Sequence, residues 1–348
     1  MNPYVLMILL SSLGLGTTMT FAGSHWMLAW MGLEINTMAI IPLMTQQQHP
    51  RAVEAATKYF LVQATAAAMI LFASTTNAWM TGQWDINNLP NATTATMITF
   101  ALALKIGLAP MHLWLSEVLQ GLDLLTGLIL STWQKLAPLA LLIQTAQMAD
   151  PLLLTSLGVL SSLIGGWSGL NQTQLRKILA YSSIAHMGWM IIIIQHAPQL
   201  TVIALVVYIF MTSAAFLTLK KVSATKISTL TMIWPKSPVL AAMTTLVMLS
   251  LGGLPPLTGF MPKWLILQEL TAQGLPTTAT FMAMTALLSL YFYLRLCYAM
   301  TLTTSPSTNN SPPHWRTQAN QSVLPLTTVT MIAVGLLPLT PMVLMVLT

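Results

Sequence analysis

The sequence predicts an all-α polytopic membrane protein. Hydrophobic residues make up 55% of the 348 residues and charged residues only 6%, and the mean hydropathy is +0.73. A soluble domain usually contains about 25% charged residues. The apolar residues also gather in successive runs, each long enough to cross the roughly 30 Å hydrocarbon core of a bilayer as a helix of about 20 residues. Composition and segment length therefore agree on the fold class.

Each apolar run is expected to form one transmembrane helix, about eleven in total, within a single membrane domain that covers residues 1–348. No loop between the runs is long enough to form a soluble domain. The runs lie at 3–20, 25–44, 59–79, 94–119, 122–145, 149–171, 174–195, 199–219, 238–270, 276–299 and 324–346.

Two of these segments, 94–119 and 238–270, are longer than a span requires, and glycine and proline interrupt both. The two interruptions share a Gly-Leu-x-Pro core. Matching broken helices are typical of transporters, and binding sites lie near such breaks. Two unrelated proline kinks, which membrane helices tolerate, are the alternative. The residues expected to break the helices are Gly107, Pro110, Gly253, Pro255 and Pro256.

The breaks fall in the fourth and ninth segments, so the pattern repeats after five spans. Because five is an odd number, the second copy should enter the membrane in the opposite orientation. We therefore predict a first five-helix repeat at 1–145, an inverted second repeat at 149–299 and a C-terminal transmembrane helix at 324–346.

Charged residues in the loops predict the orientation, because basic loops favour the side of the membrane on which the chain is synthesised. Alternate loops are basic, and the intervening loops carry acidic residues or histidine. The N-terminus is therefore predicted on the basic side and the C-terminus on the opposite side. The basic loops hold Arg51, Lys58, Arg176, Lys177, Lys220, Lys221, Lys226, Lys236 and Arg316, and the other loops hold Asp85, Asp150, His196 and Glu269.

Four ionisable side chains lie inside apolar segments: Glu34, Lys105, Lys135 and Lys263. A charge at bilayer depth costs roughly 2.5–3.5 kcal/mol on insertion scales, so its presence indicates function. Burial disfavours the charged form, which allows such a group to exchange a proton near neutral pH. The set therefore predicts a path for protons or cations. The alternatives are a static Glu–Lys pair and, for Lys263, a side chain that extends to the membrane surface.

Four other polar residues are candidates for the same path. His186 lies near the centre of the seventh segment and is either a packed core residue or a switchable relay group. Ser182 and Ser183 could hold water or a hydrogen bond to another helix, and His112 lies in the first break.

Several other kinds of chemistry are excluded. The single cysteine, Cys297, cannot form an internal disulfide, an iron–sulfur site or a cysteine-based zinc site. No His, Asp or Glu cluster has metal-ligand spacing, and the net charge of +6 is scattered instead of forming a stripe that binds nucleic acid. We therefore expect no metal, cofactor or nucleic acid on this chain, and any redox chemistry must occur on another subunit.

The run at 177–188, Lys-Ile-Leu-Ala-Tyr-Ser-Ser-Ile-Ala-His-Met-Gly, resembles the motif of the antiporter-like, proton-translocating membrane subunits of respiratory complex I. The resemblance covers essentially the whole chain. By position, Glu34 matches the membrane glutamate of that family and Lys135 its central lysine. Lys105 and Lys263 match the lysines of the two broken helices, and His186 matches a histidine thought to help hydrate the central axis.

The resemblance implies a subunit that couples NADH-to-ubiquinone electron transfer elsewhere in complex I to proton pumping through a Glu/Lys/His relay. It implies the mitochondrial inner membrane, with the basic loops in the matrix and with phospholipids and other antiporter-like and small membrane subunits as neighbours. NADH, FMN, iron–sulfur clusters and ubiquinone would bind elsewhere in the complex. A freestanding cation/proton antiporter and a structural membrane subunit without a proton path are the alternatives.

Overall fold

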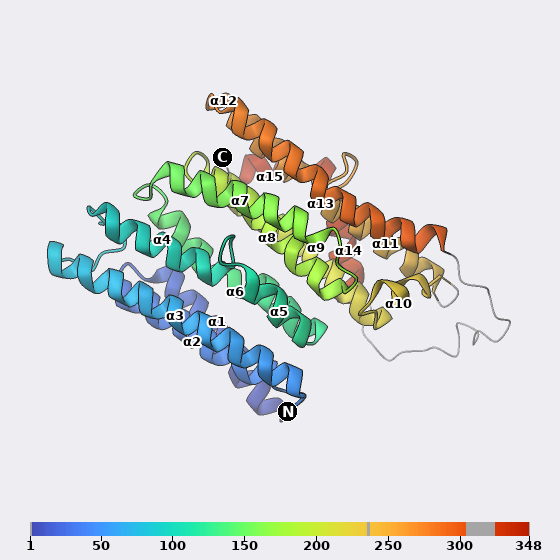
Figure 1. The fold of residues 1–348 in the computed structure, drawn as a ribbon, viewed down its shortest axis with the longest axis horizontal. Helices are drawn as coiled ribbons and strands as arrows, with labels where there is room; N and C mark the ends of the chain where they lie inside the picture. The colour runs from blue at the N-terminus through green and yellow to red at the C-terminus, as the bar shows by residue number, and fades with distance from the viewer. Residues whose placement is uncertain (1, 235–236, 304–323, 348) are drawn as a thin grey trace. The chain divides into compact units, whose positions relative to one another are not determined.

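The computed structural model describes residues 2–234, 237–303 and 324–347, and the regular elements within these ranges are helices (Figure 1). Seven of the described helices are long and apolar enough to cross a membrane. Two of the predicted basic loop residues, Lys236 and Arg316, lie outside the described ranges. The α-helices are α1 (Pro3–Ala22), α2 (Trp26–Met44), α3 (Pro50–Thr81), α4 (Ala92–Ile106), α5 (Leu113–Gly121), α6 (Leu124–Thr145), α7 (Pro151–Gly169), α8 (Leu175–Ile193), α9 (Pro198–Val222), α10 (Ile227–Thr231), α11 (Pro238–Gly252), α12 (Phe260–Ala272), α13 (Pro276–Leu302), α14 (Leu324–Gly335) and α15 (Thr340–Leu347), and η2 (Leu337–Leu339) is a 3₁₀ turn.

The helices form two compact units. The first unit contains Met1–Ser162 and Met187–Pro198, and the second contains Leu163–His186 and Gln199–Thr348. Helices α7 and α8 therefore contribute residues to both units. Each unit also contains one interrupted helical segment, formed by α4 and α5 in the first unit and by α11 and α12 in the second.

Small residues allow α1 and α2 to pack closely in the first unit. A methyl group on Gly16 would lie 2.8 Å from the Gly32 carbonyl oxygen, and a methyl group on Gly32 would lie 2.7 Å from the Gly16 carbonyl oxygen. Both positions therefore need glycine. An indole hydrogen bond links α2 to the next helix, because Trp30 Nε1 donates to the Ala67 carbonyl of α3 at 3.2 Å.

Many buried hydroxyl groups donate to their own helices. Thr17, Ser131, Thr212 and Thr244 each donate to a backbone carbonyl three or four residues earlier. This local bond satisfies the hydroxyl hydrogen without a donor–acceptor contact to another helix. Threonine and serine can therefore occur throughout apolar helices.

Two pairs of connections are bonded together in the first unit. The turn before α2 lies against the loop between α3 and α4, where the Trp26 amide donates to the Trp84 carbonyl at 3.0 Å and the His25 and Trp84 rings stack. At the other pair, Gln195 after α8 donates to the Ala146 carbonyl after α6 at 3.1 Å. Each contact joins loops that the predicted orientation places on the same side of a membrane.

A third pair of connections lies in the second unit. The Leu175 amide donates to the Thr225 carbonyl at 3.1 Å, and the Ile227 amide donates to the Thr173 carbonyl at 3.2 Å. These bonds bring the segment before α8 to the segment before α10. The residues thereby gathered at one end of the unit include the basic residues Arg176, Lys177 and Lys226.

Two elements differ from the boundaries expected from hydropathy. Helix α3 begins at Pro50 instead of near residue 59, because proline suits the first helical turn and His49 Nδ1 accepts the Arg51 amide hydrogen. The C-terminal helix expected at 324–346 is interrupted after Gly335. Pro338 accounts for this break, since proline has no amide hydrogen to continue the α-helical bonding pattern.

Candidate functional site

The two helix breaks have the same backbone geometry. Gly107 follows α4 with a φ of +84°, and Gly253 follows α11 with a φ of +81°. At both breaks the amide of the next leucine donates to the carbonyl five residues before it. This glycine-centred motif commonly ends helices, because glycine adopts the left-handed conformation without steric cost. The predicted breaking residues Pro110, Pro255 and Pro256 lie in the non-helical segments that follow.

Side chains of the first unit bond the carbonyl groups left free where α4 ends. Trp114 Nε1 donates to the Leu104 carbonyl at 3.1 Å, and Gln63 Nε2 of α3 donates to the Lys105 carbonyl at 3.4 Å. His112 is buried, and its Nδ1 lies 3.2 Å from the Pro110 carbonyl oxygen. The position of His112 in the bonded backbone of the break is consistent with a structural role as well as with a relay role.

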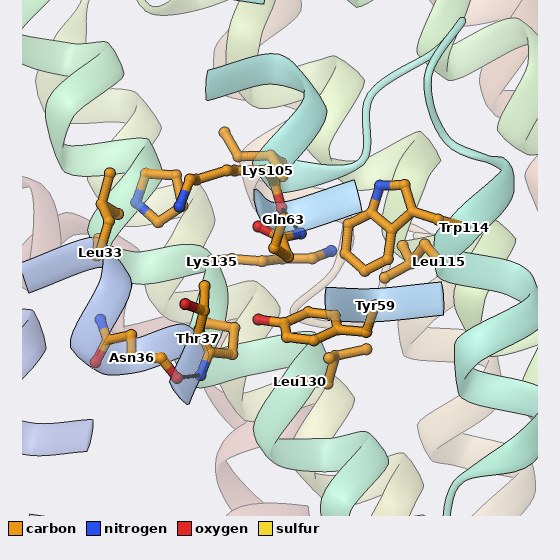
Figure 2. Close-up of a pocket in the computed structure, with 14 residues that line it drawn as sticks. Leu33, Asn36, Thr37, Tyr59, Gln63, Lys105, Trp114, Leu115, Leu130 and Lys135 are labelled. Carbon is orange, nitrogen blue, oxygen red and sulfur yellow. Dashed lines mark hydrogen bonds between the residues drawn. The ribbon is translucent and has the colours of Figure 1, made fainter. Parts of the chain in front are cut away.

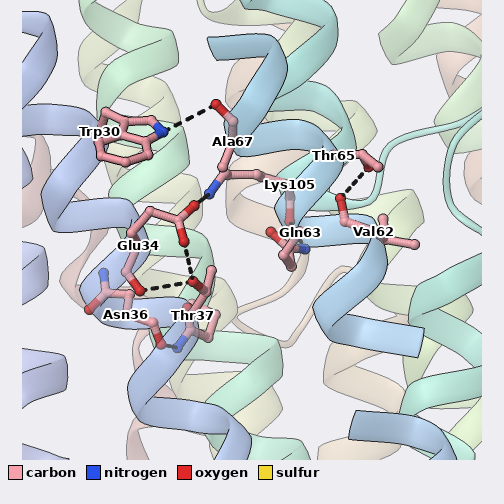
Figure 3. Close-up of polar contacts among 10 residues, drawn as sticks. Trp30, Glu34, Asn36, Thr37, Val62, Gln63, Thr65, Ala67 and Lys105 are labelled. Carbon is pink, nitrogen blue, oxygen red and sulfur yellow. Dashed lines mark hydrogen bonds and ion pairs between the residues drawn. The ribbon is translucent and has the colours of Figure 1, made fainter. Parts of the chain in front are cut away.

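The break positions Lys105 to meet Glu34. Lys105 lies in the last turn of α4, and its Nζ is 4.0 Å from Glu34 Oε1 on α2 (Figure 3). The Thr37 hydroxyl lies within hydrogen-bond distance of both the Glu34 backbone carbonyl, at 2.8 Å, and the other carboxylate oxygen, Oε2, at 3.3 Å. The Lys105 side chain is 2% exposed and that of Glu34 23% exposed. Lys105 Nζ and Glu34 Oε1 have no hydrogen bond to described residues, so the two charges attract each other without being locked together.

Lys105 and Lys135 line one small cavity in the first unit (Figure 2). The open space is about 10 Å³, which is enough for about one water molecule. Figure 2 shows Gln63 between the two lysine side chains, whose amino ends point in opposite directions. Lys135 is 2% exposed, in the middle of α6. The other polar residues that line the cavity are Asn36, Thr37, Tyr59, Gln63, Trp114 and Gln134.

Lys263 lies in the first turn of α12 in the second unit and does not extend to the surface. Its side chain is buried, and Nζ donates to the Gly252 carbonyl at 2.8 Å. Gly252 is the last residue of α11, so the ammonium group bonds the end of the opposite half of the broken helix. The alternative in which Lys263 extends to the membrane surface is therefore wrong, because its charge has a buried acceptor.

His186 lies in a hydroxyl-rich region of the second unit. Its ring lies 5.6 Å from the ring of Tyr208 on α9, centroid to centroid. Ser182 and Ser183 donate to carbonyls of their own helix, α8, at 2.8 and 2.7 Å. Ser183 also interacts with the Tyr208 hydroxyl on α9. The hydroxyl hydrogen of Ser183 is used within α8.

Sequence reasoning missed the residues that organise these charges. Gln63, Gln134 and Trp114 line the cavity, and Tyr208 lies beside His186. The amides could have been found, because glutamine is a rare and costly residue inside an apolar span. The aromatic residues gave no such signal, since Trp and Tyr are common in membrane helices.

One further charge was overlooked. Arg295 lies in α13, and its Nη1 donates to the Leu170 carbonyl after α7 at 2.6 Å. A guanidinium group at a helix C-terminus interacts favourably with the helix dipole. Arg295 therefore fastens two helices of the second unit together.

The described residues offer no group of three His, Cys, Asp or Glu side chains able to hold a metal ion. Cys297 is buried in α13. Glu34 and the lysines are groups that can take up or release a proton.

Comparisons with known proteins agree along the whole chain. Residues 23–289 match the family described as NADH:quinone oxidoreductase/Mrp antiporter, transmembrane, and residues 290–344 match NADH dehydrogenase subunit 2 C-terminus. The chain is 79% identical to NADH-ubiquinone oxidoreductase chain 2 of Danio rerio over 345 residues, which is 99% of each chain. It is 60% identical to the protein of the same name from Scyliorhinus canicula over 348 residues, or 100% of each chain.

Solved structures show the same fold. A chain of respiratory complex I from Thermus thermophilus is 29% identical, with a TM-score of 0.86 over 99% of this chain and 80% of that one. A chain of the Mrp complex from Dietzia sp. DQ12-45-1b has a TM-score of 0.84 over 96% of this chain and 75% of that one, at 15% identity. The chain belongs to the family of NADH-ubiquinone oxidoreductase chain 2.

Proposed function

We propose that this chain is an antiporter-like, proton-translocating subunit of mitochondrial complex I. The near-complete match to vertebrate NADH-ubiquinone oxidoreductase chain 2 supports this assignment. Electron transfer from NADH to ubiquinone takes place elsewhere in the complex, and this chain uses the released energy to move protons. It carries no cofactor of its own, and its neighbours in the inner membrane are other antiporter-like subunits, small membrane subunits and phospholipids.

The relay begins with the contact between Glu34 and Lys105. The pairing holds a proton on Lys105, and loosening it disfavours the charged lysine. The proton then passes through the water-sized cavity to Lys135 and continues toward His186 and Lys263. The observation that carries this proposal is the position of Lys105, which reaches Glu34 with its ammonium group and shares a cavity with Lys135.

The energy needed is within the range of such an interaction. Moving one charge against 100 mV requires about 2.3 kcal/mol. A tenfold change in proton affinity corresponds to about 1.4 kcal/mol. A change of roughly a hundredfold between the paired and unpaired states of a buried lysine therefore suffices.

We further propose eleven spans arranged as two inverted five-helix repeats plus a C-terminal span. The spans are the seven long apolar helices, α8, the pairs α4–α5 and α11–α12, and the segment from α14 to α15. The equal geometry of the breaks at Gly107 and Gly253 supports the repeat. The basic loops face the matrix, which places the N-terminus in the matrix and the C-terminus in the intermembrane space.

The relay is tested by measuring protons pumped per NADH in purified complex I reconstituted into liposomes. Lys135→Met should lower this ratio, because methionine fills a similar volume but cannot carry a proton. Lys58→Met is the matched control, since Lys58 is an exposed lysine paired with Glu54 and Glu117. An unchanged ratio in fully assembled Lys135→Met complexes would contradict the relay role.

A freestanding cation/proton antiporter is the second candidate, because the fold is shared with the Mrp complex. Mild detergent extraction of native membranes distinguishes the two. Migration of this chain with NADH dehydrogenase activity in a large particle supports complex I. Migration as a small particle that exchanges ions in liposomes supports the antiporter.

A further inference from the structure

We infer that the Lys263 side chain packs against Gly253 because glycine has no side chain. Gly253 thereby acts as a positioning residue that keeps this lysine bonded across the second break. The inference rests on the relay role proposed above for Lys263. The inference assigns a role to Gly253: because this residue has no side chain, the ammonium group of Lys263 can lie at the end of α11.

The first observation is the bond that crosses the break. Lys263 Nζ, from the start of α12, donates to the carbonyl of Gly252 at the end of α11 at 2.8 Å. Carbonyl groups at a helix C-terminus have no helical partner and carry partial negative charge. An ammonium group is a favourable ligand for such a carbonyl, so one buried bond joins the two halves of the helix.

The second observation is the contact between Lys263 and Gly253. A methyl group on Gly253 would lie 2.8 Å from Lys263 Nζ and 3.0 Å from its Cδ. The lysine side chain therefore occupies the space into which a side chain at position 253 would project. A side chain at position 253 would therefore force the end of Lys263 to shift, which disturbs its bond to the Gly252 carbonyl.

The first break shows that this contact is not a general property of the motif. Gly107 has the same left-handed backbone, yet a methyl group there would meet the Trp114 ring at 3.3 Å and Leu115 Cβ at 3.5 Å. Lys105 reaches across to Glu34 instead. Backbone conformation favours glycine at both breaks, whereas contact with the side chain of a lysine favours it only at Gly253.

The second break is also tied to the C-terminal part of the chain. The Thr258 hydroxyl, between α11 and α12, donates to the Ala333 carbonyl of α14. A shift of the segment that contains Gly253 would therefore reach α14 as well. The bond between Lys263 and Gly252 is in a position to couple the charge of the lysine to the backbone of this region.

The experiment uses assembled complex I with Gly253→Asn, Lys263→Met and the two combined. Asparagine tolerates the left-handed conformation, so Gly253→Asn places a side chain in the space occupied by Lys263 with little backbone strain. Gly107→Asn is the matched control for the substitution itself. Hydrogen–deuterium exchange of the peptide that covers 249–256 reports whether the break opens.

Both Lys263→Met and Gly253→Asn should raise exchange in this peptide several-fold, because the Gly252 carbonyl loses its donor. Gly107→Asn should leave this peptide unchanged. Unchanged exchange in Lys263→Met complexes would overturn the inference. This variant removes the ammonium group but leaves Gly253 itself unchanged, so it provides the test even if Gly253→Asn complexes fail to assemble.

The number of protons pumped per NADH provides a second readout. If Gly253 had only a structural role, its substitution would affect this ratio independently of Lys263. The ratio should fall in Gly253→Asn and in Lys263→Met, and the double variant should be no worse than Lys263→Met alone. Additive losses would overturn the positioning role. If Lys263→Met raises exchange but leaves the number of protons pumped per NADH unchanged, the positioning of Lys263 by Gly253 is supported and the relay role of Lys263 is contradicted.

Discussion

At the scale of single residues, the buried lysines differ in what holds them. Lys105 faces a carboxylate at 4.0 Å without a hydrogen bond, whereas Lys263 donates to a backbone carbonyl at 2.8 Å. Apolar surroundings make an unpaired charge costly, so the partner of each lysine governs how readily it gives up its proton. Substitution of the partner should therefore affect proton movement as strongly as substitution of the lysine.

Glu34→Gln is expected to lower the number of protons pumped per NADH. Glutamine retains an oxygen that can accept from Thr37 but removes the negative charge that faces Lys105. Removing one partner of a buried ion pair typically costs about 3–5 kcal/mol, so Lys105 would remain neutral instead of cycling. Glu34→Asp should have an intermediate effect, because its carboxylate is kept but is one methylene further away. Normal pumping in Glu34→Gln complexes would show that the pair is static.

Gln63→Leu is expected to destabilise the end of α4. The substitution leaves the buried Lys105 carbonyl without its donor, at a cost of about 1–3 kcal/mol. Gln134→Leu is the control, because Gln134 donates to the carbonyl of Asn36 inside α2, which also has a helical partner. The midpoint of thermal inactivation of the complex should fall more for Gln63→Leu. Equal shifts would mean that Gln63 does not support the break.

The sequence predicts the charged members of the site because a charge in an apolar run is conspicuous on its own. It does not predict that Lys105 faces Glu34 or that it shares a cavity with Lys135, since both depend on how α2, α4 and α6 pack. The role of Trp114 was equally hidden, because an indole that bonds a helix end looks the same in sequence as one that faces lipid. Residue chemistry is local, whereas the choice of partner is a property of the packed structure.

At the scale of elements, close helix packing depends on individual glycines. Gly16 faces α2 at a distance that leaves no space for a methyl group, whereas a methyl group on Gly14 would meet nothing within 4 Å. The two glycines lie two residues apart on one helix and so point to different faces. The difference provides a test of packing that leaves helix propensity the same.

Gly16→Ala should destabilise the chain by about 1–3 kcal/mol through overpacking against the α2 backbone. Gly14→Ala should have no such cost, since it adds its methyl group on an open face. Assembly yield and thermal stability of the purified complex measure the difference. Equal behaviour of the two variants would show that α1 does not pack on α2 through Gly16.

Element boundaries were predicted well where hydropathy changes sharply and poorly where local geometry decides. The Gly-Leu-x-Pro cores located both helix breaks, because glycine and proline act on the backbone directly. The early start of α3 at Pro50 was missed, since its first turns are polar and hydropathy treats them as a loop. Pro338 could have indicated the interruption of the C-terminal helix. Because the residues around it are apolar, hydropathy predicted one continuous helix instead.

At the scale of the whole molecule, successive connections should lie on opposite sides of the membrane. Asn87, in the loop after α3, and Asn171, in the turn after α7, are both exposed and are separated by an odd number of proposed spans. Cys297 is buried, so added cysteines can be labelled over a low background.

A membrane-impermeant thiol reagent applied to mitochondria without their outer membrane tests the orientation. Asn87→Cys should react directly, and Asn171→Cys should react only after the inner membrane is permeabilised. Labelling of the denatured protein confirms that both cysteines are present. Reaction of both sites from the same side would contradict the proposed span count.

The cavity between Lys105 and Lys135 also has a consequence for ion selectivity. An alkali cation must exchange its hydration shell for several oxygen ligands before it can enter a narrow site. A space of about 10 Å³ holds about one water, and two of its lining side chains are lysines, which repel metal cations when they are charged. A proton path through this cavity would discriminate against Na⁺ and K⁺ by size and by charge, so exchanging one salt for the other should leave the number of protons moved per NADH unchanged.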